Sequence, residues 1–295
     1  LLLCLMIVSS FSLASIVRVR QTSSAGDGYC VVRDGAGCSG QVFSQPTHEF
    51  ARSHMTGAQF DGSKFLGTDW AHSFDMTGVD FTKAHFAGAT LNYVDLSGAN
   101  LDHVNFAGAR INGLKLNHIG QGHNVNFSGA TMDNIELNAS RFPRAQFGGV
   151  RGTAWRAAEN TRFNDANFQY AVLADVVFAG VDLRKASFEE AHISGTSSFR
   201  GAKLNQANFR CAVLRDVDFT DAKFEQANFF GADLKGASMG DVEEFLTEAS
   251  FCETILEDGE VRSSSTVECN RIRNAPGHVV QDFCAPAPAA PALAP

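Results

Sequence analysis

Tyrosine and tryptophan are scarce in this sequence. The chain of 295 residues has 3 Tyr and 2 Trp, against 25 Phe and 27 Gly. One aromatic type used this often indicates a single kind of site that recurs along the chain, which is typical of a repeat protein. An excess of positive charge is also lacking, since the formal net charge is −8. This charge disfavours nucleic acid as a ligand.

Motifs of catalysis are absent as well. The sequence has no nucleophile motif, no phosphate-binding loop and no C-x-x-C pair. Among its histidines the best metal-binding pair is His118 with His123, but a zinc site needs three or four ligands. We therefore expect no enzyme, no cofactor and no metal. A metal-binding or enzymatic role at the insertions described below stays open as an alternative.

The first residues have neither an initiating Met nor a basic segment, but they form an apolar run, LLLCLMIVSSFSLAS. Ser12-Leu13-Ala14 fits a signal-peptidase site. Residues 1–14 are therefore predicted to be a secretory signal that is truncated at its start. The run is short for a membrane anchor, so we expect a mature chain without a membrane span. Such a chain would be periplasmic or secreted.

Six cysteines follow this segment, and an even number favours disulfides in an exported protein. Cys30 and Cys38 flank a turn-rich stretch, VVRDGAG, and are predicted to staple a hairpin. Cys211 stands alone in the middle of the chain, where we expect a free surface thiol or an intermolecular disulfide. The remaining candidates for disulfides lie near the C-terminus: Cys252, Cys269 and Cys284.

Most of the chain divides into blocks of five, as in AKLNQ ANFRC AVLRD VDFTD AKFEQ ANFFG ADLKG. Each block carries a small or β-branched residue, then a polar residue, then Phe or Leu. This period matches neither the turn of an α-helix nor the simple alternation of a strand. The pattern resembles the pentapeptide repeat family, whose consensus is A-(D/N)-L-x-x with Leu or Phe at the centre.

The resemblance implies an all-β fold, a right-handed quadrilateral β-helix in which four blocks close one coil of about twenty residues. The central residue and the small residue two before it point inward. We expect about nine to ten coils over residues 58–256, with residues 15–57 and 257–284 as caps. The segment that starts at Asp241 is expected to form a short helix, and residues 285–295, rich in Pro and Ala, a disordered tail.

Residues four blocks apart should stack into ladders inside this solenoid. One predicted ladder, here called the Phe ladder, has members whose residue numbers differ alternately by 21 and by 20, which defines a two-coil unit of 41. In the same frame Phe60 begins a second ladder and Trp70 a third. Extra residues near Ser73, at 118–123, at 152–160 and at 194–198 are expected to bulge at corners. The Phe ladder consists of Phe65, Phe86, Phe106, Phe127, Phe147, Phe168, Phe188, Phe209 and Phe229.

A polar column precedes the Phe ladder by one residue. Stacked Asn and Gln side chains there would support the sheet by hydrogen bonding from rung to rung, and the alternative is a recognition face. The polar column is predicted to consist of Lys64, His85, Asn105, Asn126, Gln146, Asn167, Ser187, Asn208 and Asn228.

A filled interior and flat outer faces favour a binding or scaffold protein over an enzyme. We expect an unknown protein partner or self-association. The family resemblance adds the thylakoid lumen to the compartments that stay open, because photosynthetic organisms have exported members of the family. The family resemblance supplies an alternative, because cytoplasmic members that resemble a DNA duplex bind DNA gyrase and protect it from quinolones. The predicted export and the interspersed basic residues weaken that alternative. These residues are Arg141, Arg144, Arg151, Arg156 and Arg162.

Overall fold

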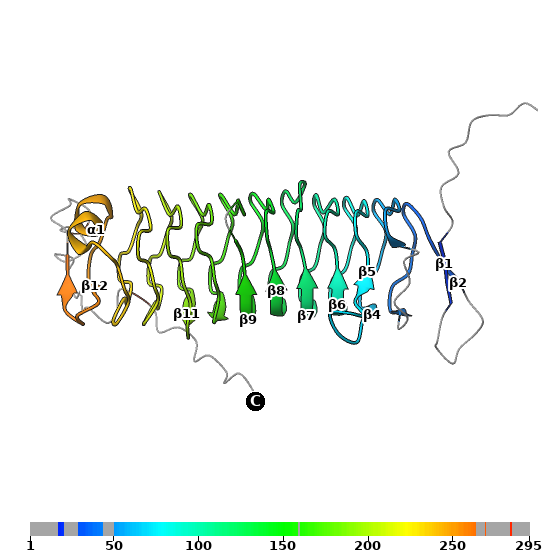
Figure 1. Ribbon diagram of the computed structural model, residues 1–295, viewed down its shortest axis with the longest axis horizontal. Coiled ribbons are helices and arrows are strands. Elements are labelled where there is room, and N and C mark those ends of the chain that lie inside the picture. The colour runs from blue at the N-terminus through cyan, green and yellow to red at the C-terminus, as the bar shows by residue number, and fades with distance from the viewer. Residues whose placement is uncertain are drawn as a thin grey trace, which may run out of the picture.

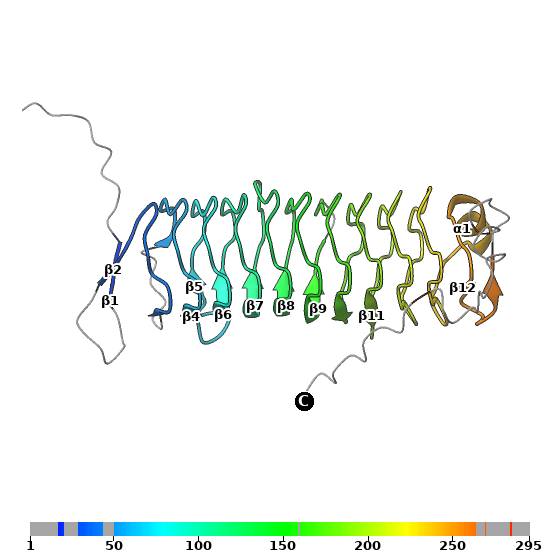
Figure 2. The same ribbon diagram turned by 180° about the vertical axis from the view of Figure 1, so that it is seen from behind.

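Successive coils of the chain stack along one axis into a rod, blue at its N-terminal end and orange at its C-terminal end in Figure 1. The rod looks equally regular from behind (Figure 2). The predicted signal peptide at residues 1–14 and the predicted tail at residues 285–295 lie outside the described residues. The computed structural model describes residues 17–20, 29–43, 50–158, 160–263, 269 and 284.

One side of the rod is a sheet of nine strands in which every pairing is parallel. Each strand pairs with the strand one coil away, so the order in the sheet follows the order in the chain. The fold is the predicted right-handed quadrilateral β-helix. The strands are β3 (Val42–Phe43), β4 (Lys64–Leu66), β5 (Phe74–Asp75), β6 (Thr90–Asp95), β7 (Arg110–Lys115), β8 (Thr131–Glu136), β9 (Arg151–Arg156), β10 (Val172–Ala174) and β11 (His192–Ser194).

The extended strands account for slightly fewer coils than the nine to ten predicted. Eight of these strands follow one another along the sheet, one per coil, and therefore make seven turns, fewer than the nine to ten expected. The difference arises because the coils near both ends pair through single residues instead of extended strands. Such isolated bridges continue the stack from Gly37 to Gln59 at one end, and from Asn228 to Ser250 at the other.

The predicted two-coil unit is present in the backbone pairing. His85 pairs with Asn105 and Asn105 with Asn126, so the residue number rises by 20 from one coil to the next (85 to 105) and then by 21 (105 to 126). Asn126 pairs with Gln146 and Gln146 with Asn167, which repeats the same two steps. The extra residue of each longer coil thus leaves the rungs in register.

The Phe ladder from Phe86 to Phe229 forms a continuous stack of buried rings. Centroids of neighbouring rings are 4.6 to 5.1 Å apart, and their planes differ by 3° to 21°. Offset stacking of this kind adds to the free energy gained by burying the rings. The ladder therefore fills one wall of the interior along most of the rod.

The first member of the predicted Phe ladder is wrong. The ring stacked on Phe86 belongs to Phe60, at 4.9 Å and 18°, whereas Phe65 lies on the neighbouring wall, where its Cα is paired with that of Leu91. Phe60 thus heads the Phe ladder instead of a second ladder, and Phe65 takes the place predicted for Trp70.

The register of Phe65 differs from the prediction because the chain leaves the stack near Ser73 for more than the single extra residue expected there. Lys64 pairs with Thr90 and Asp75 pairs with Asp95, so eleven residues (64 to 75) span a side that the next coil spans with five (90 to 95). The excursion carries Trp70 out of the core. Its ring contacts the ring of Tyr93 at 5.4 Å, and the Lys115 ammonium lies 4.9 Å from its centroid.

Corners that hold one extra residue use buried hydroxyl groups to complete their backbone hydrogen bonds. Ser140 Oγ donates to the carbonyl of Leu116 and accepts from the Ile119 amide at 2.9 Å. Thr161 Oγ1 donates to the carbonyl of Leu137 at 2.5 Å. Because unpaired buried backbone groups are costly, these hydroxyls allow the longer coils to stay in the stack.

One rung has glycine at its inward position. Gly152 pairs with Met132 below and Leu173 above, and the buried Trp155 of the same strand fills the space that a side chain would take. The indole Nε1 donates to the Met132 carbonyl at 2.7 Å. No ladder residue was predicted at this rung, because residues 152–160 have the pattern of an insertion.

The ends of the rod carry different elements. Helix α1 (Val242–Glu248) forms where a helix was predicted, with the Asp241 side chain accepting hydrogen bonds at its N-cap. Its Phe245 ring packs 5.1 Å from that of Phe229 and so covers the last rings of the core. Two antiparallel hairpins complete the described elements: β1 (Val17–Arg20) with β2 (Tyr29–Val32), and β12 (Thr254–Ile255) with β13 (Val261–Arg262).

Candidate functional site

The rod presents its outer surface, not an internal cavity, to other molecules, because the inward positions are packed with buried side chains. In the described part of the chain, no three His, Cys, Asp or Glu side chains gather where they could hold a metal ion. His123 instead lies 2.9 Å from the Asp102 carboxylate of the coil before it. None of the helices among the described residues is long and apolar enough to cross a membrane.

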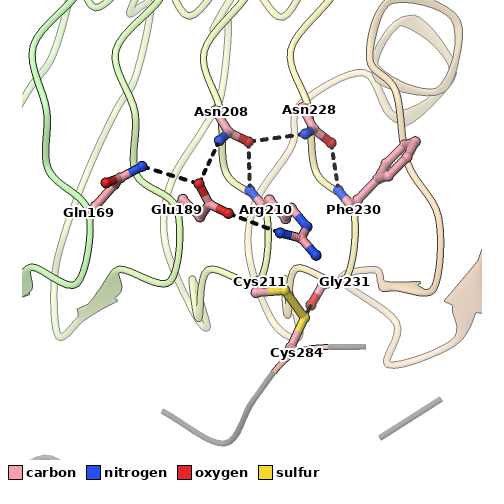
Figure 3. Close-up of polar contacts among 9 residues, drawn as sticks. All are labelled: Gln169, Glu189, Asn208, Arg210, Cys211, Asn228, Phe230, Gly231 and Cys284. Carbon is pink, nitrogen blue, oxygen red and sulfur yellow. Dashed lines mark hydrogen bonds and ion pairs between the residues drawn. A yellow bond between two sulfur atoms is a disulfide. The ribbon is translucent and has the colours of Figure 1, made fainter. Parts of the chain in front are cut away.

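The polar column forms the amide ladder that its composition suggested. Asn126 Nδ2 donates to Asn105 Oδ1 at 3.2 Å, and Asn228 Nδ2 donates to Asn208 Oδ1 at 3.0 Å (Figure 3). Each Asn side-chain oxygen of the column also accepts from the backbone N–H two residues ahead, as Asn228 does from Phe230 at 3.0 Å. These bonds tie neighbouring coils together and hold the following turn, so the amides have a structural role.

The first residue predicted for the polar column is wrong for the same reason as Phe65. Lys64 pairs with Thr90 on the adjacent side of the coil, and Gln59 is the residue below His85. The amide ladder is also broken at Ser187, whose buried Oγ has no hydrogen-bond partner among the residues that the structure describes.

A carboxylate spans the gap that Ser187 leaves. Glu189 accepts from Gln169 Nε2 at 3.2 Å, from Asn208 Nδ2 at 3.4 Å and from Arg210 Nη1 at 3.1 Å (Figure 3). This network was not predicted, although the numbers of Glu189 and Arg210 differ by 21, the length of one long coil. Since residues one coil apart are stacked neighbours, opposite charges at that spacing predict an ion pair.

We expect Ser187→Asn to raise the free energy of unfolding by about 0.5–1.5 kcal/mol, because the new amide would join the amides of Asn167 and Asn208. Ser187→Ala is the matched control, since it removes the unpaired hydroxyl without adding an amide. Urea denaturation of both variants measures the difference. If the Asn variant is no more stable than the Ala variant, the amide ladder contributes little at this rung.

The expected surface thiol at Cys211 is wrong. Its Sγ is bonded to that of Cys284 at 2.05 Å, within the same chain (Figure 3). Cys211 does lie at an outward corner, but 73 residues separate the two cysteines, and the period of the repeat cannot show where the chain returns after its last coil. A second disulfide joins Cys252 and Cys269 at 1.95 Å.

Both disulfides lie on one corner of the rod, here called the cysteine corner. The Cys211 amide donates to the Phe230 carbonyl, and the Gly231 amide donates to the Cys252 carbonyl. Gly231 therefore stacks on Cys211, and Cys252 lies one coil further, stacked on Phe230. The two coils from Asn208 through Asn228 to Ser250 span 42 residues, so Cys252 lies one residue before the position two coils above Cys211. The chain at residues 269 and 284 is thus tied twice to the same corner.

The disulfide predicted at the N-terminal flank is only half described. Cys38 is buried and disulfide-bonded. The expected partner, Cys30, lies in β2, whose side chains lie outside the described part of the structure.

Peptide mapping without reduction should recover one peptide that joins Cys211 to Cys284 and another that joins Cys252 to Cys269. Cys211 should resist alkylation by iodoacetamide in the native protein and react after treatment with dithiothreitol. Mass spectrometry measures both results. Alkylation of Cys211 in native, unreduced protein would contradict this disulfide and show that Cys211 is a surface thiol.

Comparison with protein families gives two matches along the rod. Residues 75–117 match the model of "Pentapeptide repeats (8 copies)", and residues 171–251 match that of "Pentapeptide repeat region". No curated protein matches this chain.

Solved structures similar to the chain are also pentapeptide repeat proteins. HetL from Nostoc sp. strain PCC 7120, a protein involved in heterocyst differentiation regulation, is 19% identical, with 77% of this chain and 91% of HetL covered and a TM-score of 0.41. The plasmid-mediated fluoroquinolone resistance protein QnrB1 is 18% identical over 70% of this chain and 90% of its own, with a TM-score of 0.41. A protein from the Arabidopsis thaliana thylakoid lumen is 21% identical over 43% of this chain and 86% of its own, with a TM-score of 0.23.

Two family models thus match separate parts of a rod whose rungs repeat every four blocks of five. This chain belongs to the pentapeptide repeat family.

Proposed function

We propose that this protein is a non-enzymatic scaffold that presents a flat side of its β-helix to a protein partner in an exported compartment. The observation that carries the proposal is the filled interior: Phe, Leu and Ala side chains occupy the inward positions, and recognition is left to the outer faces and corners. Catalytic sites and small-molecule sites need a concavity with convergent polar groups. The two described disulfides support an exported compartment.

The cysteine corner is the best candidate for the docking edge. Tyr170 lies on it with 54% of its surface exposed, next to Glu190 and then Cys211 along the same stack. Tyrosine is enriched at protein interfaces, where its ring buries a large area while its hydroxyl keeps a polar contact. The Cys211–Cys284 disulfide holds Cys284 beside these residues.

Gyrase binding by duplex mimicry is the weaker alternative. A surface that mimics DNA needs a continuous array of negative charge. Here Arg141 and Arg162 occupy neighbouring rungs of one face, and Arg184 lies one coil further. Their positive charges interrupt the acidic surface along that face.

A photoreactive amino acid at Tyr170 tests the proposal. Illumination in the native compartment should give one defined adduct with a partner protein or with a second copy of the chain. The same amino acid at Lys185, an exposed corner residue on another side of the rod, is the matched control. The adduct should disappear when Glu190 is replaced by Lys, which leaves the core untouched. Equal adducts at both positions, or none at either, would argue against a working face at the cysteine corner.

A further inference from the structure

Three arginines line one hollow of about 440 Å³ on the face that carries Arg141 and Arg162. The third is Arg144, and the other polar lining residues are His123, Asn124, Asn164 and Asp165. Arg141 and Arg162 occupy neighbouring rungs of the same stack, so their side chains start side by side. This set of residues is here called the arginine hollow.

The arginines of the hollow have no carboxylate partner among the described residues, in contrast to several others on the surface. Arg184, Arg210 and Arg215 lie 2.7, 3.1 and 2.6 Å from the carboxylates of Asp182, Glu189 and Asp233. Like charges on adjacent rungs repel each other, which destabilises the empty hollow. The unpaired charge is thus concentrated in one concave place.

Two further carboxylates close to the hollow are already engaged. Asp182 is the rung above Arg162, but Arg184 holds both of its oxygens, through Nε at 2.8 Å and Nη2 at 2.7 Å. Burial alone would raise the pKa of Asp182, yet the hydrogen bonds from Arg184 outweigh it and lower the pKa, so this carboxylate stays ionised and paired. On the other side of the hollow, Asp102 is paired with His123.

We propose that the arginine hollow binds a doubly charged tetrahedral oxyanion of the phosphate or sulfate class, free or as the terminal group of a small molecule. Guanidinium groups from neighbouring rungs suit such an ion, because each can donate two hydrogen bonds to adjacent oxygens. The amide groups of Asn124 and Asn164 add neutral donors at the rim. Asp165 also lines the hollow, which leaves a formal charge of +2 from three arginines and one carboxylate. This net charge selects a dianion over a monocarboxylate.

The proposal is independent of the protein-docking function, since the arginine hollow and the cysteine corner lie on different sides of the coils. It also accounts for a basic cluster on a chain whose net charge is −8.

Titration of the full chain at low ionic strength tests the site, with inorganic phosphate, sulfate, glycerol phosphate and acetate as probes. We expect saturable heats in calorimetry for the three tetrahedral anions, much weaker binding of acetate, and a rise in melting temperature with added phosphate. Tighter binding of glycerol phosphate than of inorganic phosphate would identify an esterified group as the ligand, and the reverse order would identify the free ion.

The double variant Arg141→Gln/Arg162→Gln should weaken phosphate binding by about tenfold or more, because it removes charge-assisted hydrogen bonds. It should also melt at a higher temperature than the parent without phosphate, since the repulsion between the rungs is gone. The control is Arg110→Gln/Arg151→Gln, which removes the same charge from the sheet face, where Arg110 and Arg151 pair with Thr131 from opposite sides and so lie two coils apart. An equal loss in both double variants, or no saturable phosphate binding by the parent, would overturn the proposal.

Discussion

Phe147→Ala should lower the free energy of unfolding by about 3–5 kcal/mol, because the rungs on either side cannot close the gap. The Phe147 ring is stacked between those of Phe127 at 5.1 Å and Phe168 at 4.6 Å, and it meets the ring of Trp155 edge-on at 5.6 Å. Backbone hydrogen bonds fix the spacing of the coils, so a smaller side chain leaves a cavity. Guanidinium denaturation followed by circular dichroism measures the loss.

Phe230→Ala is the matched control for that loss. Phe230 directly follows the ladder residue Phe229, but its ring lies on the outer side of the coil and is only half buried (Figure 3). Its removal should cost a small fraction of the Phe147→Ala loss, because it leaves no internal cavity. Similar losses for the two variants would contradict a core built on the Phe ladder.

The sequence was sufficient to predict the fold and most of its register, because the inward positions recur with a fixed period. The Phe ladder from Phe86 to Phe229 needed only the spacing of like residues. The predicted register was wrong at Phe65, where the excursion between Lys64 and Asp75 replaces one side of a coil. A loop that leaves the stack and returns has no period, and two frames with Phe at the inward position were both compatible with the pattern.

The outer surface was harder to predict, because the residue at an outward position depends on its neighbours in the next coil and not on the consensus of the repeat. Glu189 and Arg210 pair across one coil, which the spacing rule would have shown. The disulfide partner of Cys211 could not be predicted from the spacing of the coils, because Cys284 follows the last coil in the sequence. The arginine hollow could be predicted in part. The spacing of one coil places Arg141 beside Arg162, but only the structure shows that Arg184 binds the carboxylate of Asp182, one rung further.

The rung at Gly152 shows how a departure from the repeat is compensated within the fold. An inward glycine would leave a void in a stack of large side chains, and voids in a close-packed core are costly. Trp155, three residues later in β9, fills that space and is itself fully buried. The sequence pattern alone marked this stretch as irregular, because neither residue fits the consensus.

Gly152→Ala should therefore lower the free energy of unfolding by about 3 kcal/mol or more, since the added carbon overpacks the rung. A Cβ on Gly152 would lie 2.0 Å from the Met132 carbonyl oxygen and 2.8 Å from the Trp155 Nε1 atom, so the backbone or the indole must move. Gly148→Ala is the matched control, because the nearest atoms to its Cβ are 3.7 Å away and ordinary contacts result. That variant should change stability by about 0.5 kcal/mol or less. Urea denaturation of both variants measures the contrast, and equal stabilities would show that the rod relaxes at this rung and that the glycine is not required for the close approach of β8 and β9.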